Sequence, residues 1–296
     1  SALSHAQRMS YPTTQKDDYW DAFCCALVLL QRMDELPDAN PQDIYFNIGQ
    51  LVGRRKALGN AGIAIKNQLH QQLSYHYPSY RKFFSEVDGK TALNFFEEYP
   101  SPSKLKGIDV EKLGDKLKEW SNHFLGINKA KEIVELVEKD GDTTREFQEH
   151  RDFLIKSIVK ELRYKNEETN LIDKQLEALL KHLDYKLTTI QGVDTATAAG
   201  IIAEIGDISR FKSSDSLARF AGCAPVSFSS GSSAKVSISK QGNRALNSVL
   251  YMLAMRQIVV TKDTQTPYNE YYYQYYQKKL KEGKTKASAI VCIQRK

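Results

Sequence analysis

In the stretch Ile158–Leu183, IVKELRYKNEETNLIDKQLEALLKHL, a set of mostly apolar residues recurs at alternating intervals of four and three. This spacing is the heptad pattern of a helix that buries a narrow stripe against another helix. Polar residues occupy two central positions, where they weaken a seam but restrict its register and partner. The stripe consists of Ile158, Leu162, Lys165, Thr169, Ile172, Leu176, Leu179 and Leu183. The sequence therefore predicts one long helix here.

A second helical stripe precedes it in LVGRRKALGNAGIAIKNQLHQQLSYHY, formed by Leu51, Leu58, Ile65, Leu69 and Leu73. Two long helices joined by an insert predict an antiparallel coiled coil, although the seam fits an interface between two chains equally well. The insert, residues 78–152, carries a helix-breaking YPSPSKLKG and the run HFLGINKAKEIVELVEKDG. The latter predicts a loop, a helix and a glycine stop. The residues of the insert suggest no chemistry.

The start of the chain predicts a core helix. TTQKDDYWDAFCCALVLLQRM is amphipathic and has acidic residues in its first turn. Only about fifteen residues precede it, too few to supply the surface on which such a helix packs. Either the helix docks elsewhere, or the chain lacks an N-terminal portion. Cys24 and Cys25 are expected on its buried face.

Composition indicates a folded protein. The 296 residues are 41% hydrophobic, no apolar run approaches 18 residues, and SALSHAQRMSYP at the start lacks an apolar signal core. The four cysteines form no CxxC pair, which fits a reduced, cytosolic protein.

Positive charge is concentrated in the last third of the chain. Residues 187–296 contain 15 Lys and Arg against 7 Asp and Glu, a net charge of +8, and the rest of the chain has a net charge of −2. A basic domain favours a polyanionic partner, usually nucleic acid.

The segment LTTIQGVDTATAAGIIAEIGDISRF indicates a helix-hairpin-helix. We expect a helix that ends at Ile190, a turn at residues 191–194 and a second helix to Ile205, capped by Asp194 or Thr195. Backbone N–H groups in such a turn, around Gly192, can bind a phosphate, although the negative charge of Asp194 opposes this. A purely structural hairpin is the alternative interpretation.

A serine-rich stretch follows in SFSSGSSAKVSISKQGN, Ser227–Asn243. By composition alone this is a solvated linker. It lies, however, between the hairpin with FAGCAP on one side and RALNSVLYMLA on the other. In that order these motifs resemble the IS-one-ten (Piv-type, DEDD) insertion-sequence transposases. KDDYWDA near the start, the coiled-coil stretches and the closing YYQKKLKEGKTKASAIVCIQRK extend the resemblance over essentially the whole chain.

The resemblance implies a nucleophilic serine in the pattern Pro-x4-Ser-Gly. Counting from Pro225 places Ser230 there, with Ser229 as the rival by adjacency. A serine hydroxyl is a weak nucleophile that needs a base or a metal-organised site, together with basic groups that stabilise charge on the phosphate. Lys240 and Arg244 are candidates for such groups, because both are positively charged and both lie close to the serine in the sequence. Lys235, Gly192 and Asn243 complete the expected DNA- or RNA-binding residues, and Gly242 with Asn243 suits a tight turn into the next helix.

The resemblance also implies an RNase H-like (RuvC-like) site of four acids that binds Mg²⁺. Its Asp-x-x-Asp pair corresponds to Asp18 and Asp21, which at a spacing of three share one helix face. Asp17 stands where threonine is usual, so an Asp17–Asp21 pair is an alternative. The first aspartate and the glutamate of the family lie on strands that have no counterpart before Thr13. We therefore expect half of the acidic site to be missing, which puts catalysis by this chain in doubt.

The tyrosine-rich tail, TPYNEYYYQYYQKKLKEGKTK, allows two interpretations. Its rings can stack on unpaired bases, or they can face the core at the helical positions Tyr268, Tyr272, Tyr275 and Tyr276. The family resemblance implies a structured non-coding guide RNA, and the tail fits such a partner without demonstrating it.

The sequence thus predicts a mainly α protein with three parts. Residues 1–34 would be the last helix of a RuvC-like domain, 35–186 a helical coiled-coil domain with an insert, and 187–296 a transposase domain containing the helix-hairpin-helix. The leading hypothesis is a bacterial or archaeal, cytoplasmic, nucleoid-associated DNA transposase or recombinase acting as a dimer or tetramer. The alternatives are a catalytically incomplete nucleic-acid-binding remnant and a structural coiled-coil protein.

Overall fold

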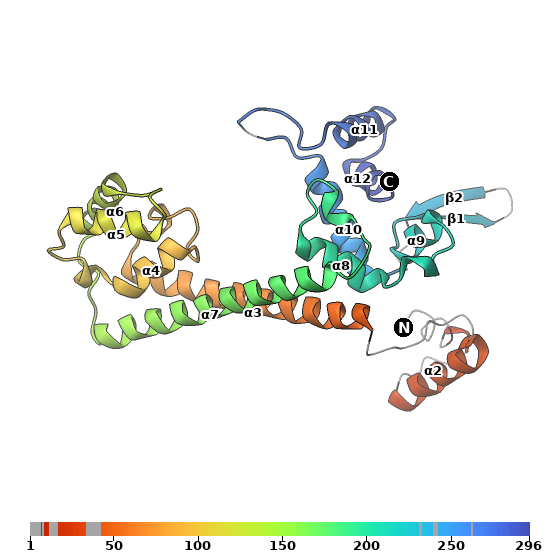
Figure 1. Cartoon of the computed structure of the whole chain (residues 1–296), viewed down its shortest axis with the longest axis horizontal. Helices are drawn as coiled ribbons and strands as arrows, with labels where there is room; N and C mark the ends of the chain where they lie inside the picture. The colour runs from red at the N-terminus through yellow and green to blue at the C-terminus, as the bar shows by residue number, and fades with distance from the viewer. Residues whose placement is uncertain are drawn as a thin grey trace. The chain divides into compact units, whose positions relative to one another are not determined.

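The computed structural model describes residues 7, 9–11, 17–33, 43–230, 233–238, 242–261 and 263–296, except for the side chains of 32, 226–230 and 233–238. The fold is mainly α, as predicted (Figure 1). Across this described part, no helix combines the length and the apolar character that crossing a membrane requires. The chain divides into two compact units. One comprises residues 53–175, and the other comprises residues 1–52 together with 176–296.

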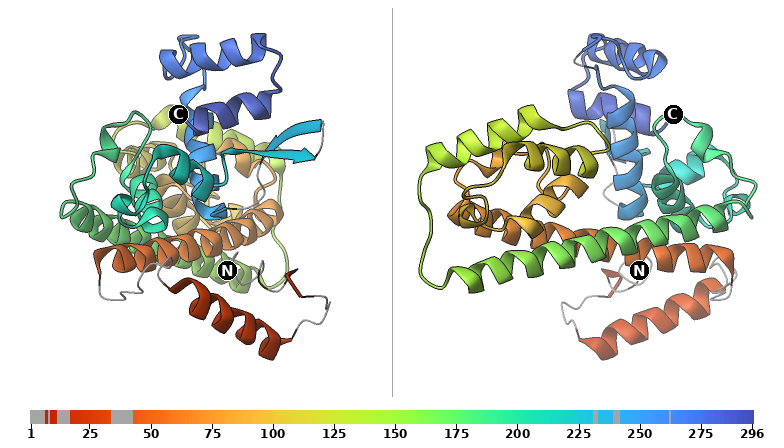
Figure 2. Two further views of the ribbon diagram at one scale, coloured as in Figure 1. Left: turned by 90° about the vertical axis from the view of Figure 1, so that its right-hand side faces the viewer. Right: turned by 60° about the vertical axis from the view of Figure 1, so that its left-hand side comes forward.

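Two long helices form the frame of the 53–175 unit. They are α3 (Ile44–His76) and α7 (Gln148–Leu180), and they lie side by side in Figures 1 and 2. Arg55 contacts Asp173 near one end, whereas His76 contacts Gln148 near the other, so the helices run antiparallel. The predicted stripe is buried at Ile158, Leu162, Ile172 and Leu176 of α7 and half-buried at its other positions, and its last residue, Leu183, lies beyond the end of the helix.

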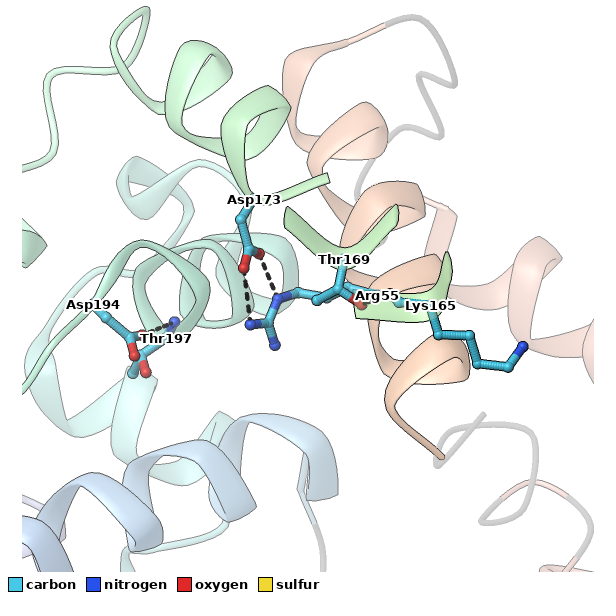
Figure 3. A network of polar contacts seen from close by, with 6 residues as sticks. All are labelled: Arg55, Lys165, Thr169, Asp173, Asp194 and Thr197. Atoms are coloured by element: carbon cyan, nitrogen blue, oxygen red, sulfur yellow. Dashed lines mark hydrogen bonds and ion pairs between the residues drawn. The ribbon is translucent and has the colours of Figure 1, made fainter. Parts of the chain in front are cut away.

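A polar contact crosses this pair of helices beside the predicted polar positions. The Arg55 guanidinium donates through Nε and one terminal nitrogen to the two carboxylate oxygens of Asp173, at 2.5 and 3.1 Å (Figure 3). Thr169, one turn earlier on α7, donates its hydroxyl to the carbonyl of Lys165. A fork-like ion pair fixes orientation better than a single contact, so Arg55 and Asp173 set the register of the two helices.

The insert between these helices has a dense aromatic core. It contains η2 (Tyr80–Lys82), α4 (Lys90–Glu98), η3 (Pro102–Lys104), α5 (Val110–Trp120) and α6 (Ile127–Asp140). Tyr77, Phe83, Phe95 and Phe96 are fully buried within it, with ring centroids 5.3–6.4 Å apart. The predicted helix and glycine stop in this insert are confirmed by α6 and its C-cap, Gly141, at φ 75°.

A buried polar chain ties the insert to the ends of both long helices. His76 is 3% exposed, and its Nδ1 lies 3.1 Å from the amide nitrogen of Gln148. The same amide nitrogen donates to Asp152, whose other carboxylate oxygen accepts the Ser101 hydroxyl. Burial lowers the pKa of His76 below its usual value, although Asp152 opposes the shift.

The second unit contains α2 (Asp18–Arg32) and the C-terminal elements. These are η4 (Leu187–Thr189), α8 (Thr195–Ile205), η5 (Ile208–Arg210), α9 (Ser214–Phe220), β1 (Pro225–Ser230), β2 (Ser233–Ile238), α10 (Arg244–Gln257), α11 (Glu270–Lys281) and α12 (Lys286–Gln294). β1 and β2 pair in antiparallel register from Pro225↔Ile238 to Ser230↔Ser233. The region taken from the sequence as a loop therefore contains a β-hairpin.

The first arm of the predicted helix-hairpin-helix differs from expectation. α7 ends at Leu180, and only the short 3₁₀ helix η4 precedes Ile190. The expectation of a helix ending at Ile190 was therefore wrong. The second arm is α8, and its N-cap is Asp194, whose carboxylate accepts the Thr197 N–H at 2.8 Å (Figure 3).

The start of α2 matches the predicted capped helix. Asp17 is the N-cap and accepts the Trp20 N–H at 2.7 Å. Cys24 is buried as expected, but Cys25 is exposed because the next residue of a helix points about 100° away. Large apolar side chains of α2 are exposed at Tyr19, Phe23, Leu29, Leu30 and Met33.

Candidate nucleic-acid interface

The β1–β2 hairpin, which carries the predicted nucleophile, starts from a tight crossing of two backbone segments. Gly222 lies just before β1 at φ 70°, and Gly242 lies after β2 at φ 129°. A Cβ on Gly242 would lie 2.6 Å from the Gly222 nitrogen and 2.9 Å from the Phe220 carbonyl oxygen. Only glycine satisfies both the positive φ and this close approach. The glycine of the sequence Gln-Gly-Asn therefore lies where two backbone segments are in direct contact.

Asn243, just before α10, forms hydrogen bonds that hold the same two backbone segments together. Its backbone N–H donates to the Phe220 carbonyl at 2.7 Å, and its side-chain oxygen caps α10 through Leu246 N–H. Its amide nitrogen also donates to Glu204 at 2.6 Å, which connects α10 to α8. In this structure Asn243 has a structural role, and the role as a nucleic-acid ligand that the sequence suggested stays a prediction.

The two candidate serines occupy successive positions at the far end of β1. Ser230 pairs with Ser233, and Ser229 pairs with Ala234. Successive residues of a strand belong to opposite faces of a sheet, so the two serines are not equivalent positions. Ser230 is the last residue of β1, six residues beyond the end of FAGCA.

The expected basic partners of the serine are distributed around the hairpin. Arg244 is the first residue of α10 and is exposed. Lys235 lies on β2, opposite Phe228 in the register, and its side chain is outside the described atoms. Lys240 lies outside the described residues.

A further basic group near the hairpin, Arg210, is not marked by any motif in the sequence. Its guanidinium carbon lies 4.7 Å from the ring centroids of both Phe211 and Phe220, and the residue is exposed. Phe220 is also the residue whose carbonyl receives Asn243 N–H. The two rings contact each other, with centroids 5.2 Å apart, and the arginine lies against both of them near the base of the hairpin. A positively charged residue in the segment ISRF was visible, but its contact with Phe220 is tertiary and has no sequence motif.

The turn around Gly192 is packed against other parts of the C-terminal domain. Gly192 has φ 87°, and its carbonyl accepts Arg256 at 2.9 Å. Gln257, 3% exposed, donates to the Gln191 carbonyl at 2.6 Å, and Gln191 donates to the Tyr268 carbonyl at 2.8 Å. These contacts connect the turn to the end of α10 and the loop before α11. They give the turn a structural function whether or not it also binds phosphate.

Most of the tail tyrosines pack rather than protrude. Tyr272, Tyr275 and Tyr276 pack on the cluster formed by Ala254, Ile290 and Ile293. Tyr271 is 59% exposed, and the Lys296 ammonium lies 5.0 Å from its ring centroid. The core interpretation therefore fits three of the four tyrosines named from the sequence.

The fourth tyrosine, Tyr268, lies against Gly192. Its Cε1 would be 3.2 Å from a Cβ at that glycine. Arg295, the C-cap of α12, pairs with Asp215 of α9 at 2.7 Å, and this arginine lowers the pKa of the Asp215 carboxyl. The tail is thus anchored to the domain through packing and one exposed ion pair.

The start of α3 connects to the C-terminal domain through two phenols. The hydroxyls of Tyr45 and Tyr185 lie 3.4 Å apart, and Tyr185 also accepts the Ile208 N–H and donates to the Gly206 carbonyl. The hydrogen bond to Tyr185 and burial raise the pKa of Tyr45 to about 12. The Tyr45 phenol therefore stays protonated at neutral pH and acts as a neutral hydrogen-bonding group.

The expected metal ligands lie in the first turn of α2. Asp18 is exposed and Asp21 is half-buried. Asp17 accepts a hydrogen bond at the helix N-terminus, so the cap is its structural role here. Among the described residues, no three His, Cys, Asp or Glu side chains gather as a metal site would require. Asp18 and Asp21 can supply two oxygen ligands, which is part of the six that Mg²⁺ prefers.

The C-terminal region of the chain is similar to known proteins. Residues 184–271, which include α8, the hairpin and α10, match the model of the transposase IS116/IS110/IS902 family. A 43.6 kDa protein of insertion element IS110 from Streptomyces coelicolor is 25% identical over 96% of this chain and 69% of its own length. The C-terminal part of the chain, residues 184–271, thus matches this transposase family, and the similarity to the IS110 protein extends over nearly the whole chain.

Two further similarities extend the relation. An IS116 protein of Streptomyces clavuligerus is 23% identical over 98% of this chain and 71% of its own length. The pilin gene-inverting protein of Moraxella lacunata is 31% identical over 50% of this chain and 47% of its own length. Members of the transposase family thus resemble this chain beyond the matched domain, across the long helices and the insert.

Proposed function

We propose that this chain acts in DNA transposition or recombination, with Ser230 as the nucleophile that cleaves and rejoins a strand. The observation that carries the proposal is the family match across residues 184–271, which places Ser230 within the matched domain at the end of β1. A relative whose name describes gene inversion supports recombination as the reaction class.

The proposed step is a phosphoryl transfer. The Ser230 oxygen forms a bond to a DNA phosphorus as one phosphorus–oxygen bond to deoxyribose breaks, which leaves a serine phosphodiester and a free DNA hydroxyl. The serine proton passes to a base, and the departing oxygen takes up a proton. Because one phosphodiester replaces another, the reverse step can join a different DNA end without an external energy source.

Basic groups near the hairpin suit the charge of this step. Arg244 begins α10, and Arg210 lies against the Phe211 and Phe220 rings at the hairpin base. Guanidinium groups donate two parallel hydrogen bonds to phosphate oxygens and stabilise negative charge that develops in the transition state. Lys235 and Lys240 would add charge from the strand and the segment after it. DNA is therefore the proposed partner of this face.

Asp18 and Asp21 are the proposed ligands of a magnesium ion. A bound Mg²⁺ would polarise the phosphate and orient the attacking group. The exposed apolar residues of α2, including Tyr19 and Leu30, support the proposal that α2 packs on further RuvC-like structure in the working recombinase. An antiparallel coiled coil of α3 and α7, a helix-hairpin-helix at α8 and a dimeric or tetrameric state complete the proposed architecture. A guide RNA is proposed on the family resemblance alone.

A covalent adduct tests the proposal. The chain would be incubated with Mg²⁺ and a nicked, labelled DNA that carries an element end, then denatured and separated by size. We expect a labelled protein band with wild type and with Ser229→Ala, and no band with Ser230→Ala. An undiminished band in Ser230→Ala would contradict the assignment. Salt-dependent DNA binding without any adduct would instead indicate a nucleic-acid-binding protein without strand cleavage.

A further inference from the structure

The helical insert contains a pocket for which the sequence gives no motif. Two segments far apart in the chain, residues 81–92 and 121–129, enclose a cavity of about 610 Å³. This volume lies in the range of small-molecule and nucleotide sites. The wall of the pocket includes Phe84, which is half-buried and packs on Phe95 and Phe96 of the aromatic core. The pocket therefore has a firm apolar wall.

The rim of this pocket is cationic. Arg81, Lys82, Lys90 and Lys129 line it, against one carboxylate, Glu86. Glu86 is already paired with Lys66 at 2.8 Å, a residue outside the pocket lining. The charge that faces the pocket is therefore strongly positive, which suits an anionic ligand.

Three of these cations are available to a ligand. Arg81, Lys82 and Lys90 are exposed, and the structure shows no ion-pair partner for them within its described portion, although Arg81 donates through Nε to the Tyr80 hydroxyl at 3.2 Å. Lys129 differs, because its ammonium donates to the Lys82 carbonyl at 2.8 Å and pairs with Glu132 at 2.9 Å. Lys129 thus helps to hold the rim together, while the other three can turn toward phosphate.

An aromatic side chain stands at the edge of the same pocket. Phe124 is 89% exposed and follows Asn122 and His123, which have φ values of 51° and 68°. The left-handed region is unfavourable for residues other than glycine. The loop is nevertheless fixed, because Leu125 N–H donates to the Ser121 hydroxyl at 2.7 Å and His123 N–H donates to the Lys118 carbonyl at 2.7 Å. The chain thus holds an apolar ring in water next to a positive rim.

We propose that this pocket binds an unpaired nucleotide of a nucleic-acid strand. Phe124 stacks on the base, and Arg81, Lys82 and Lys90 neutralise the phosphates on either side. An aromatic platform beside a cationic groove is the combination that single strands require, because every exposed base has a π-face and every nucleotide carries a charge. In a duplex both faces of each base are covered by neighbours, so Phe124 selects unpaired strand.

This site goes beyond the proposed serine chemistry and does not depend on it. The pocket lies in the 53–175 unit, whereas Ser230 belongs to the other unit. The variant Ser230→Ala should therefore bind single strands as wild type does. Loss of the serine–DNA adduct and loss of strand binding in the insert are thus separable outcomes.

Binding of labelled oligonucleotides tests the platform. Fluorescence anisotropy would measure the affinity of the full chain for a fluorescein-labelled 12-nucleotide RNA, for the DNA of the same sequence, and for the corresponding DNA duplex. We expect Phe124→Ala to weaken single-strand binding by about five- to a hundred-fold, the range measured for loss of one stacked base. Duplex binding should change less than two-fold. The RNA and DNA arms identify which strand the site prefers.

A matched control is available on α7. Phe153 is 73% exposed in the same unit but does not line the pocket, so Phe153→Ala should leave all three affinities unchanged. Equal effects of Phe124→Ala and Phe153→Ala, or equal losses for single strand and duplex, would overturn the proposal. Because both side chains are exposed, neither substitution should unfold the insert.

Two site-specific readouts prevent binding elsewhere on this basic protein from masking the result. In Phe124→Trp, stacking should quench the added tryptophan emission when a single strand binds, and Phe153→Trp should show no such quenching.

The double variant Lys82→Ala with Lys90→Ala should reduce the slope of log affinity against log salt concentration by about 1.4, since each phosphate contact on a single strand contributes about 0.7. Lys160→Ala, an exposed lysine of α7, should leave the slope unchanged. Unquenched emission in Phe124→Trp at saturating strand would overturn the proposal.

Discussion

The helical insert and the hairpin-bearing domain are stabilised by different means. In the insert, four large aromatic side chains are completely buried and contact one another. Around the hairpin, the tightest contact joins two backbone segments, at the crossing of Gly222 with Gly242. The insert depends on buried apolar area, which tolerates small shifts. The hairpin domain depends on close backbone approach, which tolerates no added atom.

The largest expected effect comes from the aromatic core. Phe95→Ala should lower the free energy of unfolding of the insert by about 3–5 kcal/mol, because it removes a fully buried ring and leaves a cavity among Tyr77, Phe83 and Phe96. Chemical denaturation followed by circular dichroism measures the change. Phe153→Ala, at an exposed ring, should change it by less than about 0.5 kcal/mol. Similar losses for the two variants would show that the insert core is not where its stability resides.

The second effect tests the backbone crossing. Gly242→Ala should cost roughly 2–3 kcal/mol, since it forces a positive φ and a Cβ clash against the Gly222 and Phe220 backbone. Its matched control is Gly59→Ala in α3, where a Cβ meets open space. That change should stabilise by about 0.5–1 kcal/mol because alanine favours helix. A Gly242→Ala protein of unchanged stability would refute the tight crossing.

The register contact between α3 and α7 should have a smaller effect. Arg55→Lys keeps the charge but loses the two-pronged contact with Asp173, and both side chains are about one-third exposed. Screening by solvent limits the expected loss to about 0.5–1 kcal/mol. A double-mutant cycle with Asp173→Asn measures the coupling energy between the two side chains. A coupling energy of zero would show that this pair does not stabilise the packing of α3 on α7.

The smallest expected effect is a pH dependence of the insert. His76 has a pKa lowered by burial, so the unfolded chain binds its proton more tightly than the folded one. Stability contributed by the neutral ring is complete above the unfolded value of about 6.5 and declines as the pH falls below it. Melting temperature measured from pH 7.5 to 5 should therefore fall, and His76→Gln should flatten the curve. An equal slope in both proteins would rule out His76 as the cause.

Local signals accounted for much of the fold. The acidic cap of α2, the glycine stop after α6 and the stripe of α7 depend on residues within one or two helical turns, so the sequence predicts them directly. The hairpin was missed because the serine-rich composition indicated a linker, although apolar and polar residues alternate at Val226 and Phe228 in β1 and at Val236 and Ile238 in β2. The helix predicted to end at Ile190 is only a short 3₁₀ turn, and the following carbonyls of Gln191 and Gly192 accept hydrogen bonds from Gln257 and Arg256, which no local pattern indicates.

The candidate site was predictable only in part. Ser230 followed from the family pattern, and its role stays a prediction, as do those of Asp18 and Asp21. Arg210 gains its position from rings at Phe211 and Phe220, which lie one and ten residues away in sequence. The pocket of the insert joins segments about forty residues apart, so its charge and its exposed Phe124 become a site only in the folded chain.

Mapping the residue that becomes linked to DNA tests the central claim most directly. The trapped adduct would be digested with nuclease and protease, and the peptide carrying the remaining nucleotide would be fragmented by mass spectrometry. The account predicts the added mass on Ser230, in both wild type and Ser229→Ala. Added mass on Ser229, or on any residue outside the hairpin, would contradict it.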